Sequence, residues 1–137
     1  MNRTDLQKLA NSRIREAQIL FKAGEYSGAY YLAGYSVECA LKACFAKGVK
    51  RFDFPEKSTT NKVHTHDLEG LVELANLKKE RFAATQINKR FEAGWNVVFK
   101  WTEQSRYSTF TRDDADAILD AITRTRDGVL PWIKQRW

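Results

Sequence analysis

The sequence predicts an all-α fold, an up-and-down bundle of four long helices and one short helix. Apolar residues recur at helical spacing along most of the 137-residue chain, and no strand-like alternation of useful length occurs. Only two prolines and seven glycines are present, which leaves little room for a strand-and-turn architecture. A chain of this length suits one hydrophobic core, so residues 1–137 are expected to form a single domain.

The first two expected helices form an antiparallel hairpin. One runs from about residue 5 to 23, with Thr4 as the expected N-cap and Gly24 as a stop signal. The other runs from about 27 to 47 and is expected to stop at Gly48. Its apolar residues cover nearly the whole circumference, which predicts that other helices surround it.

The middle of the chain is expected to hold a long loop and then the short helix. Pro55 and a cluster of Ser, Thr and Asn favour a loop over residues 48–65. A loop of this length in a compact domain is usually functional or mobile. The short helix is expected to start near His66 or Asp67, and its apolar side consists of Leu68, Leu71, Val72, Leu74 and Ala75.

Two further helices complete the expected bundle. One covers about residues 78–101, with an apolar stripe that comprises Phe82, Ile87, Phe91, Trp95, Val98 and Phe99. After a second loop, the last helix starts behind Thr111, an N-cap that precedes two acids suited to the helix dipole. Gly128 and Pro131 are expected to bend this helix or end it early.

The charge is basic and unevenly distributed. The formal net charge is +6 and the pI is near 9.4. Four basic segments alternate with acidic ones; they are residues 1–24, 42–62, 78–100 and 124–137. If the fold merges them into one face, that face would attract a polyanion such as RNA. A basic surface that is merely solvated explains the same pattern, and charge alone leaves both interpretations open.

Local sequence features indicate where the protein is located and whether it binds a cofactor. The N-terminal segment has no apolar core of the signal-peptide kind, so a cytoplasmic location is expected. Glu38 and Lys42 interrupt the longest apolar run, so no membrane span is expected. Cys39 and Cys44 have no metal or redox spacing and are interpreted as small buried hydrophobes. No phosphate loop, dinucleotide fingerprint or zinc signature occurs, so no cofactor is expected.

Glu38 and Lys42 are the first candidate site residues. They lie one helical turn apart in the middle of the apolar helix, at a depth where charges are expensive. The pair fits a binding site for a polar ligand. It fits equally a structural role, in which it fixes helix register while Lys42 reaches water along its aliphatic stem.

A second set of candidates lies in two loops. His64, His66 and Asp67 suggest a metal site only weakly, because no further ligand is near in sequence, and a place for His66 beside a helix cap is favoured. His66 also suits acid–base chemistry near neutral pH. Arg106 and Tyr107, flanked by two serines, suit a phosphate or carboxylate ligand. A helix cap or a surface salt bridge is the alternative for Arg106.

The run from Gly24 to Ala43, GEYSGAYYLAGYSVECALKA, closely resembles the prokaryotic HEPN domain family. His-Asp-Leu at 66–68 and Ser-Arg-Tyr at 105–107 match short family motifs in the same order, and the resemblance covers about residues 10–133. It implies an all-α bundle of four to five helices, often homodimeric, similar to the helical C-terminal domain of kanamycin-type nucleotidyltransferases. It also implies an MNT-type nucleotidyltransferase as partner in a toxin–antitoxin pair.

The ribonuclease motif of that family is missing. Active HEPN toxins are metal-independent ribonucleases that use an Arg followed four to six residues later by a His, paired across the dimer. Arg51 is too far upstream of His64 and His66 for that spacing, and no His follows Arg106. The related Arg-x4-His-x-Tyr motif is also absent from the sequence. The resemblance therefore implies only a polar cluster at one end of the bundle, comprising Glu38, Lys42, His66, Asp67, Arg106 and Tyr107.

Three hypotheses for function follow. The first is a dimeric module that binds a nucleotide, RNA or a nucleotidyltransferase partner. The second is a ribonuclease with an altered centre, in which Arg106 holds the scissile phosphate and His66 is the base toward the ribose 2′-hydroxyl, assisted by Lys42 or Tyr107. The third is a structural polar network without a ligand. Four tryptophans are more than one small core needs, so some are expected at a dimer interface; they are Trp95, Trp101, Trp132 and Trp137.

Overall fold

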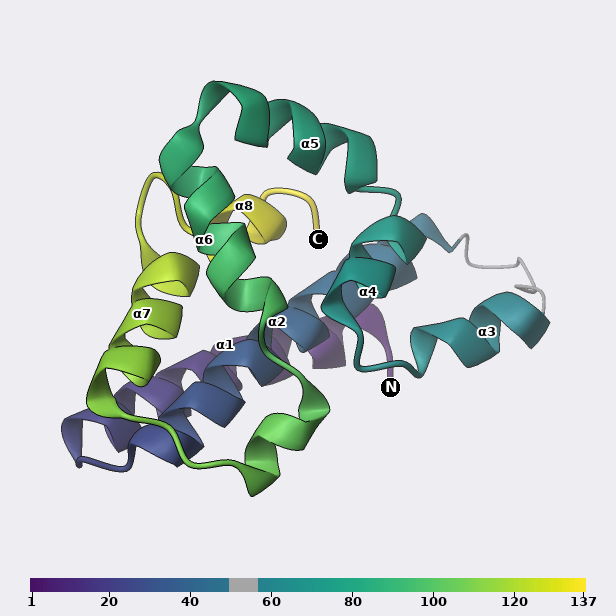
Figure 1. Cartoon of the computed structure of the whole chain (residues 1–137). Helices are drawn as coiled ribbons and strands as arrows, with labels where there is room; N and C mark the ends of the chain where they lie inside the picture. The colour runs from purple at the N-terminus through teal and green to yellow at the C-terminus, as the bar shows by residue number, and fades with distance from the viewer. Residues whose placement is uncertain (50–56) are drawn as a thin grey trace.

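A computed structural model describes residues 1–49 and 57–137 of the chain. Within these ranges all regular structure is helical, which confirms the predicted all-α class (Figure 1). The described part holds eight α-helices and one 3₁₀ helix rather than the five helices expected. They are α1 (Arg3–Lys22), α2 (Tyr26–Gly48), α3 (Lys57–Val63), α4 (Leu68–Leu74), α5 (Lys78–Ile87), α6 (Lys89–Phe99), η1 (Glu103–Tyr107), α7 (Arg112–Thr123) and α8 (Val129–Lys134).

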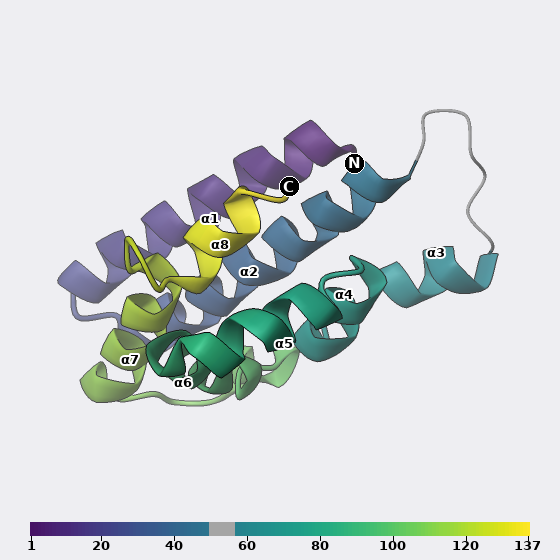
Figure 2. The ribbon, with the colours of Figure 1, turned by 90° about the horizontal axis from the view of Figure 1, so that it is seen from above.

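Helix α2 lies at the centre of the bundle, as its apolar circumference predicts. It pairs with α1 as an antiparallel hairpin, and it also contacts α4, η1, α7 and α8. Figure 2 shows α1 and α2 in one layer and α4 to α7 in another, while α3 extends past the end of the bundle beyond α4. Twelve residues of α2 are buried. Because the middle of α2 is mostly buried, a buried charge there such as Glu38 must find its partners inside the protein.

A close contact fixes η1 against α2. The ring of buried Trp101, just before η1, lies directly over Gly34, where a Cβ atom would approach the ring to 2.2 Å. The indole Nε1 of Trp101 donates a hydrogen bond of 3.1 Å to the carbonyl oxygen of Tyr31. Because Gly34 has no side chain, the Trp101 ring can pack directly on the backbone of α2. This packing brings the following 3₁₀ helix, η1, to the middle of α2.

The single helix expected over residues 78–101 is wrong, because Asn88 divides it into α5 and α6. Asn88 has an extended backbone (φ −134°, ψ 98°), and its side chain accepts the backbone N–H of Phe91 at 3.0 Å. Its amide also donates to Asp127 at 2.6 Å. The break turns α5 outward, so Phe82 and Ile87 are exposed rather than part of an apolar stripe.

Other boundaries also differ from the sequence-based expectation. Residues 57–63 form α3 instead of loop, whereas Pro55 lies outside the described residues. The cap of α1 is Asn2 rather than Thr4, because the Asn2 side chain accepts the backbone N–H of Asp5 at 2.9 Å. Gly48 belongs to the last turn of α2. The last helix ends early, as expected, but it ends at Thr123 rather than at Gly128 or Pro131; Gly128 precedes α8, and Pro131 lies within it.

Two of the four tryptophans are too buried for the expected dimer interface, which stays a prediction for the other two. Trp95 and Trp101 are buried in the core of one chain, whereas Trp132 and Trp137 are half-buried against it. Arg81 lies over the rings of Trp95 and Phe99, with its guanidinium carbon 5.5 and 5.0 Å from the ring centroids.

None of the helices in the described ranges has both the length and the hydropathy needed for a bilayer crossing.

Acidification should weaken α7 through its N-terminal capping box. The Asp114 carboxylate accepts the backbone N–H of Thr111 at 2.9 Å, and this bonding lowers the pKa of Asp114 from its usual 3.8. Because the folded pKa is the lower one, the stabilisation is present above the unfolded value and is lost as pH falls through the folded value. We expect Asp114→Asn to lower the thermal midpoint at neutral pH, and the difference from wild type to shrink as pH falls below the usual carboxyl value of 3.8. A constant difference across the pH series would contradict this.

Candidate functional site

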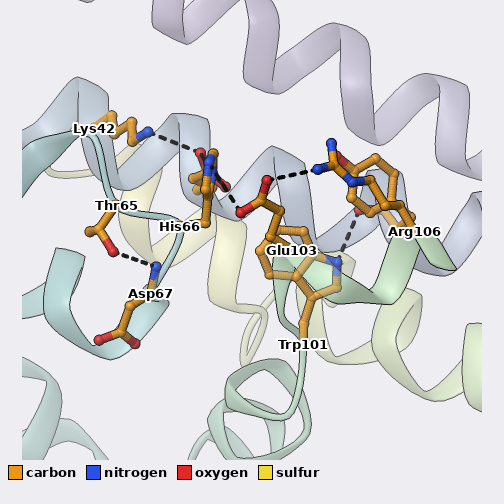
Figure 3. Close-up of polar contacts among 9 residues, drawn as sticks. Lys42, Thr65, His66, Asp67, Trp101, Glu103 and Arg106 are labelled. Atoms are coloured by element: carbon orange, nitrogen blue, oxygen red, sulfur yellow. Dashed lines mark hydrogen bonds and ion pairs between the residues drawn. The ribbon is translucent and has the colours of Figure 1, made fainter. Parts of the chain in front are cut away.

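The buried carboxylate of Glu38 on α2 is the centre of the candidate site. Lys42, one turn further along α2, places its Nζ 2.9 Å from Glu38 Oε1. His66, in the segment before α4, places its Nδ1 2.9 and 3.0 Å from the two carboxylate oxygens. A carboxylate only accepts hydrogen bonds, so His66 donates through Nδ1. Glu38 is thereby paired with two basic side chains from two parts of the chain, Lys42 and His66, both labelled in Figure 3.

The same histidine connects Glu38 to η1. Its second ring nitrogen, Nε2, lies 3.4 Å from Glu103 Oε2. The other oxygen of Glu103 accepts from Arg106 Nη2 at 3.1 Å. These contacts form a continuous series, hereafter the polar row, which consists of Lys42, Glu38, His66, Glu103 and Arg106 (Figure 3).

The side chains of the polar row that lie outside α2 are more exposed than the two on α2. The side chain of Glu38 is 3% exposed and that of Lys42 is 18% exposed. His66 reaches 40% and Arg106 reaches 44%. The buried end is therefore fixed by strong, desolvated charge pairing, and the outer end presents a guanidinium group to solvent.

Local structure holds the outer end of the polar row in place. At the start of η1, Thr102 N–H donates to Ser105 Oγ at 3.2 Å, and Ser105 N–H donates to the carbonyl oxygen of Thr102 at 3.0 Å. Trp101, which directly precedes Thr102, is held against α2 by its hydrogen bond to the carbonyl oxygen of Tyr31. The Asp67 backbone N–H donates to Thr65 Oγ1 at 3.1 Å, which shapes the turn that carries His66. Both segments that dock on α2 to supply the polar row, the turn with His66 and the η1 segment, thus have hydrogen bonds that hold them in shape.

Two of the six residues expected at the site lie outside the polar row. The carboxylate of Asp67 points away from His66, toward Gly70 in the first turn of α4 (Figure 3). Tyr107 is 74% exposed and makes no hydrogen bond to the row. Its ring instead lies beside Arg106, whose guanidinium carbon is 4.9 Å from the ring centroid. Arg106 and Tyr107 together form an exposed cation–π pair at the outer end.

Glu103 joins the two halves of the site and was not among the expected residues. It lies three positions before Arg106, a spacing at which opposite charges meet on one helical turn. That spacing was the available signal. The approach of Glu103 to His66 depends on how η1 docks on α2, which local spacing does not indicate.

Cys39 follows Glu38 on α2 and has little nucleophilic character. Burial, together with the neighbouring Glu38 carboxylate, raises the pKa of the Cys39 thiol to about 12. Burial likewise raises the pKa of Cys44 to about 11. Both cysteines are free and buried, as expected from the sequence. In the part of the chain that the structure describes, no group of three or more His, Cys, Asp or Glu side chains is arranged to hold a metal ion.

The fold and the polar row define a helical-bundle protein whose central helix carries a buried, paired carboxylate. The family model described as the HEPN domain matches residues 4–130, nearly the whole chain. The protein therefore belongs to the HEPN family, which confirms the resemblance seen in the sequence. Searches of curated proteins and of solved structures gave no match.

Proposed function

We propose that this HEPN protein is a binding module for RNA or a nucleotide, and that it lacks a ribonuclease centre of the usual kind. The observation that carries the proposal is the exposed pair of Arg106 and Tyr107 at the outer end of the polar row. A guanidinium group binds phosphate oxygens, and an exposed aromatic ring stacks an unpaired base. The net charge of +6 adds a general attraction for a polyanion.

Glu103 orients the guanidinium group of Arg106 and leaves it exposed to solvent. One guanidinium nitrogen, Nη2, is held by Glu103 Oε1 at 3.1 Å. An arginine side chain has five N–H donors, so most remain free for a phosphate group. Because the guanidinium also lies against the Tyr107 ring, a phosphate and its neighbouring base meet a preformed pair of partners.

The environment of His66 favours binding over cleavage. The Nδ1–H group is engaged by Glu38, and Nε2 faces Glu103 at 3.4 Å. A general base must come within hydrogen-bond distance of the substrate hydroxyl. A ribose 2′-hydroxyl would have to displace the Glu103 carboxylate to reach Nε2. The guanidinium group of Arg106 is itself paired with the same carboxylate.

Fluorescence anisotropy with labelled single-stranded RNA tests the proposal. We expect Arg106→Ala and Tyr107→Ala each to weaken binding about tenfold, the value of one phosphate or one stacked base. Arg15→Ala, which removes the same charge from an exposed position of α1, is the matched control and should change affinity little. Equal losses in Arg15→Ala and Arg106→Ala would show that only net charge matters and would overturn the proposal.

A dimer that pairs with an MNT-type nucleotidyltransferase is also proposed, on the resemblance to toxin–antitoxin proteins. The exposed apolar side chains of α5, Phe82 and Ile87, support a contact with a second copy. Light scattering at concentrations on the order of tens of micromolar should give a dimer mass, and Ile87→Glu should lower it. A wild-type monomer in that range would exclude the dimer.

A further inference from the structure

A cavity separate from Arg106 lies at the end of the α1–α2 hairpin. It is a cavity of about 660 Å³ between the first turns of α1, the C-terminal half of α2 and the end of α3. Small-molecule sites in proteins typically occupy about 300 to 1,000 Å³. Glu38 and Lys42 contribute to its wall, whereas His66, Glu103 and Arg106 do not. The cavity therefore meets the polar row at its Lys42 end, whereas the proposed RNA site lies at its Arg106 end.

The wall of this cavity is largely hydrocarbon. Leu6 and Leu9 come from α1, Phe45 comes from α2, and Val49 and Val63 border it at the ends of α2 and α3. Each of these five side chains is only partly buried. Their remaining apolar surface faces the cavity, where an apolar ligand would remove it from water.

The charged side chains that line the cavity in the described part of the chain are two cations, Arg3 and Lys42, and one carboxylate, Glu38. The Arg3 guanidinium also donates a hydrogen bond of 2.7 Å to the carbonyl oxygen of Trp137. The Glu38 carboxylate is occupied by Lys42 and His66. An ammonium group has three donors, and Glu38 takes one of those on Lys42, so donors remain for a ligand. The cavity thus offers a long apolar wall with a cationic group beside it.

We propose that this cavity binds an amphipathic carboxylate with an aliphatic body, such as a medium-chain fatty acid. The aliphatic chain would lie against Leu6, Leu9 and Phe45, and the carboxylate would pair with Lys42 and Arg3. A nucleotide fits less well, because its sugar and phosphates require more hydrogen-bond partners than this wall supplies. The site is independent of the proposed RNA site, so either proposal stands or fails by its own test.

Calorimetric titration with dodecanoate, below its critical micelle concentration, tests the proposal. Dodecyltrimethylammonium and dodecanol have the same chain with a cationic or an uncharged head. We expect saturable one-to-one binding of dodecanoate, with both comparison compounds about tenfold weaker or worse. No saturable dodecanoate binding would overturn the proposal. Equal affinities for the three compounds would show an unspecific apolar surface and would overturn it too.

Variants locate the binding. Leu6→Trp should fill the cavity and abolish dodecanoate binding, whereas Ile19→Trp adds the same ring at an exposed position of α1 and should leave binding intact. Lys42→Gln and Arg3→Gln should each weaken binding several-fold, about as expected for one charged partner. Lys22→Gln, at the far end of α1, is the charge-matched control. Two results would contradict the proposal that dodecanoate binds in this cavity. One is undiminished dodecanoate binding by Leu6→Trp, and the other is an equal loss of affinity in Lys22→Gln and Lys42→Gln. RNA binding by Leu6→Trp should equal that of wild type.

Discussion

Gly34→Ala should lower the free energy of unfolding by about 3 kcal/mol, because the added methyl group overlaps the Trp101 ring. Three ring atoms of Trp101 would lie 2.2 to 2.3 Å from the new Cβ. The indole cannot yield easily, since it is 2% exposed and its N–H is bonded to Tyr31. Guanidinium denaturation followed by circular dichroism measures the loss.

Gly94→Ala is the matched control for this prediction. Its added Cβ would meet the nearest atom, the carbonyl oxygen of Ala121, at 3.6 Å, an ordinary contact. Alanine also has a higher helix propensity than glycine, by up to about 1 kcal/mol, so this variant should be as stable as wild type or more so. Because Trp101 precedes η1, Gly34→Ala should also weaken RNA binding at Arg106. Equal stability of Gly34→Ala and Gly94→Ala would contradict the tight packing of Trp101 on Gly34.

Glu38→Gln should cost about 3 kcal/mol, the lower end of the range for removing one partner from a buried charge pair. The substitution keeps the shape of the side chain but leaves the cation of Lys42 and the imidazole of His66 without their carboxylate. The loss stays at the lower end because Lys42 and His66 are partly exposed and regain some hydration. Chemical denaturation at neutral pH measures it.

Glu92→Gln provides the surface comparison for Glu38→Gln. Glu92 forms an exposed pair with Lys89 at 3.7 Å on α6, and such pairs contribute about 0 to 1 kcal/mol. A small effect at Glu92 with a large one at Glu38 is expected. Similar small effects at both positions would mean that the polar row contributes nothing to stability.

The hairpin and the central helix were predictable because their signals are local. An apolar periodicity and Gly24, whose φ is +82°, define where α1 ends and α2 starts. The break at Asn88 was not predictable in the same way. Asparagine is tolerated within a helix, and here its capping conformation is supported by a hydrogen bond to Asp127, 39 residues away. Exposure of Ile87 follows from that long-range contact rather than from its own pattern.

The site was predictable to a similar extent. The contact between Glu38 and Lys42 follows from their spacing on one helix. The approach of His66 to Glu38 and of Glu103 to His66 depends on tertiary packing, above all on Trp101 lying over Gly34. Spacing therefore identified most of the participants but not the carboxylate that joins them.

The central claim is that the protein binds RNA but does not cleave it. The most direct test is to measure whether bound RNA stays intact. Wild-type protein is incubated with labelled tRNA and with total RNA in the presence of a chelator, at a concentration that saturates binding, and the products are quantified. The expected result is bound RNA that stays intact, with no product above the protein-free control. RNA cleavage that His66→Ala or Arg106→Ala abolishes would contradict it and would establish the altered ribonuclease centre instead.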